Sequence, residues 1–314
     1  MARRRVNMQI ISALIGLIAL CVVLTIMTPN FIRPDNIVNV LSQATVNGIV
    51  ALGMTFVIIT GGIDLSVGSI VAISGVIMGM LLKTPLPFIV PILVGLAVGV
   101  LCGLINGLLI TFGKLPPFIA TLGMMSVARG IALIITNGMP VSTFSEGFRW
   151  IGVGAIPLSD SFGIPVQVVF MVILYLLAYY ILRWRQVGRY IYSLGGNEEV
   201  ARLSGINVRR YKTIAYMISG LTAAIAMVVL TAKLNSAQPI AGYSYELDAV
   251  AASVIGGTSL NGGVGSVWGT LIGAIIMSVL RNGLNLLNAS SYLTQVVIGL
   301  VIICAVLIDT LRKK

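Results

Sequence analysis

The sequence contains no histidine, and this absence excludes several kinds of chemistry at once. Without imidazole there is no histidine general base, no histidine proton relay and no histidine-ligated metal site. The three cysteines, Cys21, Cys102 and Cys304, lie far apart inside apolar runs, so no disulfide framework is expected. We therefore predict no metal site and interpret the cysteines as small buried hydrophobic residues.

Charge is also scarce. Charged residues make up 9% of the 314 residues, whereas about 25% is usual in soluble domains. Apolar residues make up 58% and the mean hydropathy is +1.04, which is more apolar surface than one soluble core can bury. The sequence therefore predicts an all-α polytopic membrane protein that forms a single transmembrane domain over residues 1–314.

The motifs of the common enzyme classes are missing as well. There is no GxxxxGK[ST] phosphate-binding loop, no HExxH motif and no pair of carboxylates at catalytic spacing. The chain therefore cannot hydrolyse ATP by the usual route. We predict that it is not an enzyme and assign no catalytic residue.

Apolar runs of about 20 residues, the length of a membrane-spanning helix, recur along the chain. They predict about ten passes, at residues 8–28, 37–60, 65–82, 87–112, 117–136, 164–184, 213–232, 247–256, 267–284 and 292–311. The run at 247–256 is too short to cross alone, so it is either a half-helix or continues into the glycine-rich loop behind it. The first run is longer than the apolar part of a signal peptide and is expected to be a retained span.

The distribution of Lys and Arg predicts the orientation. Placing both termini in the cytoplasm leaves fourteen of these residues inside and five outside. The five are Arg33, Lys83, Arg149, Lys233 and Arg281. The net charge of +11 thus reflects topology, and no nucleic-acid partner is expected. Residues 137–163 form the one long outer connection, which is either a binding platform or a plain connector.

Glycines are patterned. Gly95, Gly99, Gly103 and Gly107 recur at every fourth residue, which places them on one helix face where another backbone can approach closely. Two glycine-rich breaks, at 60–69 and 256–266, each contain Gly-Gly followed by Val-Gly-Ser. This similarity hints at an internal repeat.

Polar side chains gather in the first third of the run at 37–60. Asn39, Gln43 and Asn47 are four residues apart and share one helix face. Amides hydrogen-bond hydroxyl groups without carrying charge, so this stripe suits a path for a neutral polyhydroxy solute, and it suits hydrogen bonding between helices equally well. Asn106 is a further candidate for the path.

Two charged residues fall within apolar surroundings. Asp64 precedes a span and, with Ser66, either stabilises the positive end of that helix or contacts a ligand as a gate at a broken helix. Arg129 lies inside a span, where a charge costs about 3 kcal/mol or more. We therefore expect Arg129 to have an acidic or carbonyl partner.

The most strongly charged long segment is 183–212. It carries seven Lys and Arg residues: Arg183, Arg185, Arg189, Arg202, Arg209, Arg210 and Lys212. In the predicted topology, residues 185–212 form a cytoplasmic loop, and the flanking basic residues are interpreted as topology anchors.

A short helix is predicted within this loop, at 198–205. Asn197 can cap it, Glu198 and Glu199 favour its positive end, and Gly205 can terminate it. Glu198 and Arg202 are four residues apart and are expected to pair.

The predicted helix has an apolar strip formed by Val200, Leu203 and Ser204. Two turns are too short to be stable alone, so another surface must hold the helix. It either packs on the membrane surface or on the ends of this protein's own spans, or it docks in a groove of a cytoplasmic partner.

At this point the sequence resembles a known family. The stretches that carry the resemblance are Thr45–Ala72, Pro117–Gly123, Gly188–Val208, Ser236–Leu247 and Gly256–Gly273. They resemble the permease subunits of bacterial ABC sugar importers, most closely the ribose-type branch of the monosaccharide and branched-chain amino acid permeases.

The resemblance implies a multi-pass protein of the bacterial inner membrane that works as a homodimer. Two permeases form the pore, and ATP-binding cassettes on the cytoplasmic side bind ATP and Mg²⁺, so this chain needs no cofactor of its own. A periplasmic or lipid-anchored protein delivers the sugar, which is a ribose-like monosaccharide. A ten-helix arrangement with a short or broken late helix is also implied.

The family's coupling helix, which contacts the ATPase, falls on 198–205. Glu199-Val200-Ala201 with Gly205 fits the Glu-Ala-Ala-x-x-x-Gly pattern of many importers, and an alignment that starts at Glu198 fits nearly as well. The residues assigned to this contact are Glu198, Glu199, Ala201, Arg202, Leu203 and Gly205.

The alternative function is an ion-coupled secondary sugar transporter. Such a protein needs acids or equivalent cation ligands within the bundle. Asp64 and Asp248 are expected near span ends rather than in the middle of the bundle, so this alternative ranks well below the ABC permease.

Overall fold

The computed structural model of the chain describes residues 2–159 and 162–311. Within them, seven helices are long and apolar enough to cross a membrane. They are α1 (Ala2–Met27), α2 (Pro34–Ile59), α4 (Ile89–Thr111), α5 (Pro117–Thr136), α7 (Val166–Trp184), α10 (Val208–Leu234) and α12 (Val267–Leu286). Three more helices, α3 (Val67–Leu81), α11 (Tyr245–Ile255) and α13 (Ser291–Leu311), occupy the remaining apolar runs.

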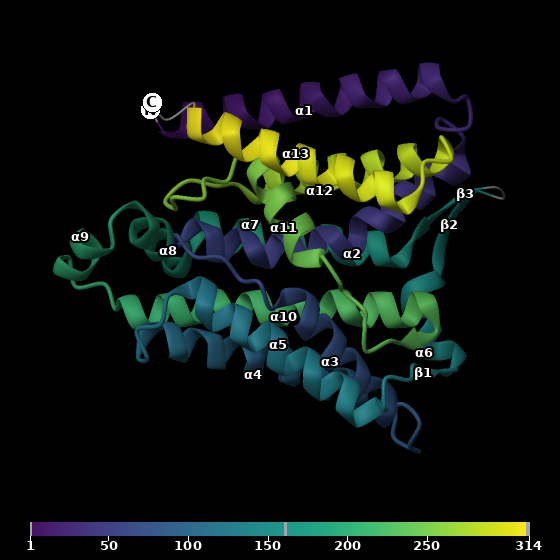
Figure 1. The fold of residues 1–314 in the computed structure, drawn as a ribbon, viewed down its shortest axis with the longest axis horizontal. Helices are drawn as coiled ribbons and strands as arrows, with labels where there is room; N and C mark the ends of the chain where they lie inside the picture. The colour runs from purple at the N-terminus through teal and green to yellow at the C-terminus, as the bar shows by residue number, and fades with distance from the viewer. Residues whose placement is uncertain (1, 160–161, 312–314) are drawn as a thin grey trace.

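Each of the ten predicted passes coincides with one of these ten helices, so the all-α polytopic architecture is confirmed. The short late helix is confirmed as α11, which has 11 residues. Figure 1 shows the long helices running side by side, with α11 covering only part of the length of the bundle.

Helix α2 lies at the centre of the bundle and packs against α7, α10, α11 and α12. Its second half is mostly apolar, and side chains such as Ile49, Met54 and Ile58 are 0% exposed. Pro34 begins the helix at a position where a missing N–H costs nothing. A helix buried on all sides forms the core to which the outer helices are fitted.

The glycine face of α4 packs against α10, which confirms the predicted close approach of two backbones. A Cβ atom added to Gly99 would lie 2.5 Å from the carbonyl oxygen of Gly220, and one added to Gly103 would lie 2.2 Å from that of Tyr216. A Cβ atom added to Gly107 would lie 2.7 Å from the Cα atom of Thr213. Larger residues at these positions would force the two helices apart.

The connection at 137–163 contains no spanning helix, as expected, but it is structured. Helix α6 (Glu146–Val153) packs on the end of α10, with Phe148 fully buried. Two short antiparallel pairs complete this end of the molecule. They are β1 (Val141–Ser142) with β4 (Ser236–Ala237), and β2 (Ala155–Ser159) with β3 (Phe162–Pro165).

The segment at 185–212, expected to be a loop with one helix, contains two. Helix α8 (Gln186–Gly196) precedes α9 (Glu198–Leu203). The expectation missed α8 because its stability comes from tertiary burial of Ile191 and Leu194 rather than from a long apolar run.

The two ends of the bundle differ in character. Helix α1 begins and α13 ends at the same end as α8 and α9, while α6 and the four strands lie at the opposite end (Figure 1). This arrangement agrees with the predicted alternation of the spans. Which end faces the cytoplasm remains a prediction, and Arg312, Lys313 and Lys314, which contribute to it, lie outside the described residues, as does Asp160.

The cysteines agree only in part with their interpretation as buried residues. Cys102 is buried and Cys21 is partly buried, but Cys304 is exposed on α13. The prediction was wrong for Cys304 because an apolar run in a membrane protein faces either protein or lipid, and its composition does not distinguish the two.

Candidate functional site

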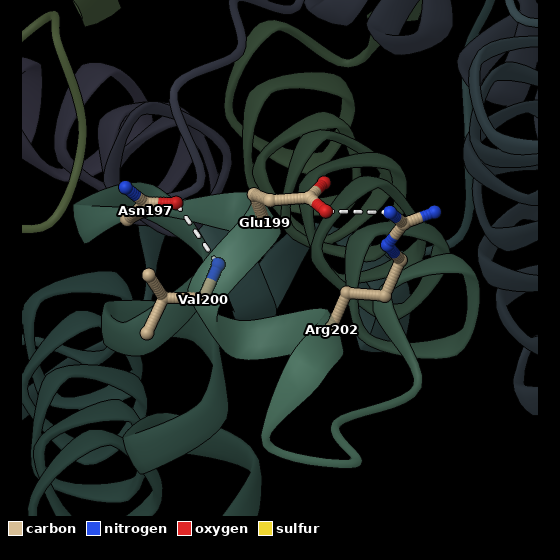
Figure 2. A network of polar contacts seen from close by, with 4 residues as sticks. All are labelled: Asn197, Glu199, Val200 and Arg202. Atoms are coloured by element: carbon tan, nitrogen blue, oxygen red, sulfur yellow. Dashed lines mark hydrogen bonds and ion pairs between the residues drawn. The ribbon is translucent and has the colours of Figure 1, made fainter.

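Helix α9 is built by the predicted cap. The side-chain oxygen of Asn197 accepts a hydrogen bond of 3.0 Å from the backbone N–H of Val200, as Figure 2 shows. At the other end, Gly205 has φ +81°, a left-handed conformation that glycine adopts without strain. Residues 204 and 205 therefore form the terminating turn, and the helix proper is two residues shorter than the predicted 198–205.

The ion pairs on α9 differ from the expectation. Arg202 pairs with Glu199 at 2.6 Å, one turn earlier in the helix (Figure 2), rather than with Glu198. Glu198 instead pairs with Lys212 at the start of α10. The prediction was wrong because spacing alone did not distinguish the Glu199–Arg202 pair from the Glu198–Arg202 pair, and it could not show a partner 14 residues away.

The Glu198–Lys212 pair has a structural consequence. It ties the first residue of α9 to α10, so Lys212 is more than a topology anchor. Because Glu198 is about half exposed, the pair orients α9 and contributes little to stability.

The predicted apolar strip on α9 is solvent-facing. Val200 is 56% exposed and Leu203 is 77% exposed, while Ala201 between them is buried. Ser204 donates its hydroxyl to the carbonyl of Val200 at 2.8 Å, which removes its polar group from the strip. A six-residue helix with two exposed aliphatic side chains has the form of a docking element.

A second feature is a polar cavity of about 530 Å³ between α2, α11, α12 and α13. Its walls carry amides, hydroxyls and one ion pair among aliphatic side chains. The polar lining residues are Gln43, Tyr243, Ser244, Asp248, Arg281, Asn285, Ser291, Thr294 and Gln295. A limited number of polar groups among aliphatic side chains is typical of a small-molecule site.

The cavity contains an ion pair. A single guanidinium nitrogen of Arg281 donates to both carboxylate oxygens of Asp248, at 2.8 and 2.7 Å. Asp248 is only 3% exposed. Arg281, one of the five residues assigned to the outer side, lies within α12, as the predicted span at 267–284 requires, and lines the cavity. The Nε–H of Arg281 is buried without a hydrogen-bond partner among the described residues.

The predicted amide stripe on α2 reaches the cavity at one position. Gln43 lines the cavity, whereas Asn39 is exposed and Asn47 is half-buried, and neither belongs to the lining. The hydrogen bonds from this part of α2 to other helices are made instead by residues close to the stripe in sequence. Asn36 and Asn282 exchange two side-chain hydrogen bonds, at 3.0 and 2.8 Å.

Sequence reasoning also missed Gln167, which donates to the hydroxyl of Ser42 at 2.5 Å. The amide–amide and amide–hydroxyl pairs hold α2 to α12 and to α7. Nothing in the local pattern singles them out, because the partners are more than 100 residues apart.

Asp64, Ser66 and Asn106 come together in a buried network separate from the cavity. The carboxylate of Asp64 is fully buried and accepts from the Ser66 hydroxyl at 2.6 Å and from the Ser219 hydroxyl at 2.8 Å. Asn106 on α4 donates to the Ser66 hydroxyl at 2.8 Å. The network joins the break after α2 to α4 and α10.

This network is not a simple helix cap. Ser66 is at the N-cap of α3 but makes no side-chain capping bond, and Asp64 accepts the N–H of Ser66 at 3.0 Å instead. The side-chain carbonyl of Asn106 is buried without a hydrogen-bond partner among the described residues. Whether these three residues act as a gate stays a prediction.

The partner of Arg129 is a pair of backbone carbonyls. Its Nη1 donates to the carbonyl oxygens of Pro239 at 2.8 Å and Ala241 at 2.6 Å. The expected carbonyl partner is thereby confirmed. The contact fixes the segment that leads into α11, and hence one wall of the cavity.

Comparison with known proteins points to one family. The profile described as "Branched-chain amino acid transport system / permease component" matches residues 36–306. A ribose import permease protein of Bacillus subtilis (strain 168) is 48% identical, over 98% of this chain and 94% of its own. The ribose import permease protein of Escherichia coli (strain K12) is 47% identical, over 96% and 94%.

A probable ABC transporter permease protein of Escherichia coli (strain K12) is 41% identical, over 97% of this chain and 90% of its own. No solved structure matches this chain significantly.

Proposed function

The chain belongs to the family of permease components of branched-chain amino acid transport systems, and we propose that it is the permease subunit of an ATP-binding cassette importer for a ribose-like monosaccharide. The observation that carries this proposal is the 47–48% identity to ribose import permeases along nearly the whole chain. The protein is a multi-pass transport subunit of the bacterial inner membrane and not an enzyme.

The cavity supplies chemistry suited to a sugar. The amides of Gln43, Asn285 and Gln295 can donate to and accept from hydroxyl groups. The Asp248–Arg281 pair adds charged donors and acceptors that stay in place because each partner holds the other. We place the translocation path through this cavity, where Gln43 is the residue of the α2 stripe that contacts the sugar, whereas Asn39 and Asn47 lie outside the lining.

The remaining path candidates lie deeper in the bundle. Asp64 and Ser66, which precede α3, are hydrogen-bonded to Asn106 on α4 and to Ser219 on α10. Their proposed role is therefore to set the position of α3 rather than to contact the sugar along its whole route.

Helix α9 is the proposed contact with the ATPase. Val200 and Leu203 offer an exposed apolar face, and a six-residue helix gains from a groove that holds it. Glu198, Glu199, Arg202 and the turn at Gly205 surround this face. The partner, not this chain, binds ATP and Mg²⁺.

Membership of an ABC permease family also implies a substrate-binding protein. We place its contact at the opposite end of the bundle, on α6 and the strands beside it. A second copy of this permease completes the pore. These two assignments rest on the proposed topology.

The ion-coupled alternative has no support in the comparisons. Asp64 and Asp248 lie near helix ends, as expected, in the break after α2 and in the first turn of α11, but both side chains are buried. However, Asp64 already accepts hydrogen bonds from two serine hydroxyls, and Asp248 is paired with Arg281. Neither carboxylate is free to bind a coupling cation in this conformation.

The function can be tested by reconstitution. The permease, its ATPase and the sugar-binding protein are placed in proteoliposomes, and uptake of radiolabelled ribose is measured. Uptake should require hydrolysable ATP on the α9 side and should survive ionophores that collapse ion gradients. Uptake by this chain alone, driven by a sodium or proton gradient, would overturn the proposal.

A further inference from the structure

Helix α8 meets the end of α2 without side chains between them. A Cβ atom added to Gly195 would lie 1.7 Å from the carbonyl oxygen of Ile59, the last residue of α2, and 2.3 Å from the backbone nitrogen of Gly263. Real Cβ atoms do not approach backbone atoms so closely, so only glycine fits at this position. Three backbone segments therefore touch directly.

The two glycine-rich breaks meet at the same place. Gly263 donates its backbone N–H to the carbonyl of Ile59 at 2.9 Å, which joins the break after α11 to the end of α2. Gly262 packs between the backbone of Gly195 and that of Gly61. The two similar breaks thus lie against each other in the structure, and together they form one junction with α8.

A tyrosine anchors the junction from the side of α8. The hydroxyl of Tyr192 donates to the carbonyl of Gly265 at 2.8 Å. Burial raises the pKa of Tyr192 to about 12, so the donor proton is retained at neutral pH. Tyr192 and Gly195 are three residues apart and lie on one face of α8.

The junction lies between the two sites described above. Helix α9 begins two residues after α8 ends, at Glu198. On the other side, α2 carries Gln43 and α11 carries Asp248, both in the wall of the cavity. Contacts between backbones cannot be absorbed by a change of rotamer, so a displacement of α8 must move its neighbours.

We propose that Gly195 is a positioning residue for ATP-driven transport: α8, seated through Gly195 on Ile59 and Gly263, transfers the displacement of α9 to α2 and α11. This inference rests on the proposed function, because it assumes that a partner ATPase moves α9. It identifies the backbone contact at Gly195 through which a movement of α9 reaches the walls of the cavity.

The experiment compares three variants of the complete complex in proteoliposomes. Gly195→Ala introduces the clashing methyl group. Gly196→Ala, the matched control, adds the same methyl group to the next residue, where nothing lies within 4 Å. Tyr192→Phe removes one hydrogen bond and keeps the ring. The readouts are co-purification of the ATPase, ATP hydrolysis, and sugar imported per ATP hydrolysed.

Gly195→Ala should keep ATPase binding and hydrolysis but lower the sugar imported per ATP by roughly tenfold. Tyr192→Phe should lower the same ratio by roughly two- to tenfold. Gly196→Ala should match the wild type. A purely structural role for Gly195 would instead reduce ATPase binding, hydrolysis and uptake together, and that result would overturn the inference.

Two further outcomes are decisive. A Gly195→Ala complex with the wild-type ratio of sugar to ATP contradicts the inference. If Gly195→Ala does not accumulate in the membrane, Tyr192→Phe provides the test of the inference. A wild-type ratio of sugar imported to ATP hydrolysed in that variant contradicts the inference as well. Failure of the proposed function is recognised separately, because it would abolish ATP-dependent uptake in the wild type.

Discussion

Arg281 and Asp248 form the one ion pair recorded inside the helical bundle in the described part of the chain, with one guanidinium nitrogen 2.8 and 2.7 Å from the two carboxylate oxygens. The partners belong to α12 and α11 and are 33 residues apart. The pair joins the short helix to a full-length one at the wall of the cavity. It therefore holds two walls of the cavity together, and in the proposed function it faces the translocated sugar.

Replacing Asp248 leaves Arg281 as an uncompensated charge whose side chain is 34% exposed and therefore partly hydrated. We expect Asp248→Asn to lower the free energy of unfolding by about 1–3 kcal/mol, less than for a fully buried pair. The double variant Asp248→Asn with Arg281→Gln should be more stable than Asp248→Asn, because no lone charge remains. Thermal unfolding of the purified permease in detergent measures both. A double variant less stable than either single one would contradict the pairing.

The cavity can be tested at Gln43. Gln43→Leu keeps the volume of the side chain but removes its hydrogen bonds to a sugar hydroxyl, so uptake should fall by roughly five- to tenfold. ATP hydrolysis should change little. Asn39→Leu is the matched control, because Asn39 lies on the same face of α2 and outside the cavity lining. Equal losses in both variants would argue that the cavity is not the main site of contact.

Docking of α9 is tested by a charge on its exposed apolar face. Leu203 is 77% exposed, so Leu203→Glu should leave the permease folded while weakening its association with the ATPase by roughly 2 kcal/mol, about thirtyfold. Arg210→Ala, an exposed change on α10 outside the assigned contact, is the control and removes only a surface cation–π contact with Tyr211. Co-purification of the two subunits reports the difference, and unaltered binding by Leu203→Glu would refute docking through this face.

The spans of this protein follow from its sequence because apolar length in a bilayer is a local property. The cap at Asn197 and the terminating turn at Gly205 are local as well, and both were correctly predicted. The residues that line the cavity were predicted only in part. Gln43 lies in the cavity, but its neighbours from α11 to α13 come from distant parts of the chain.

What the sequence could not show depends on tertiary contact. Helix α8 is stabilised by burial of Ile191 and Leu194 against other elements, which no local pattern reveals. The partners of Glu198 and Arg281 are 14 and 33 residues away, so helical spacing gave one wrong pair and missed the other. Glycine spacing did predict close packing, because a face of glycines in an apolar helix has few other uses.

That packing allows a clean test of the fold. In a helix, Gly→Ala by itself is favourable by about 1 kcal/mol, so any destabilisation must come from the space that the methyl group enters. At Gly103 the added Cβ would lie 2.2 Å from the carbonyl oxygen of Tyr216, whereas at Gly123 on α5 nothing lies within 4 Å. Gly103→Ala should therefore lower the free energy of unfolding by roughly 1–3 kcal/mol, the range for overpacked interiors. Gly123→Ala should leave it unchanged or raise it. Denaturation of the two purified variants in one detergent measures both effects, and equal stabilities would show that α4 and α10 are not in backbone contact.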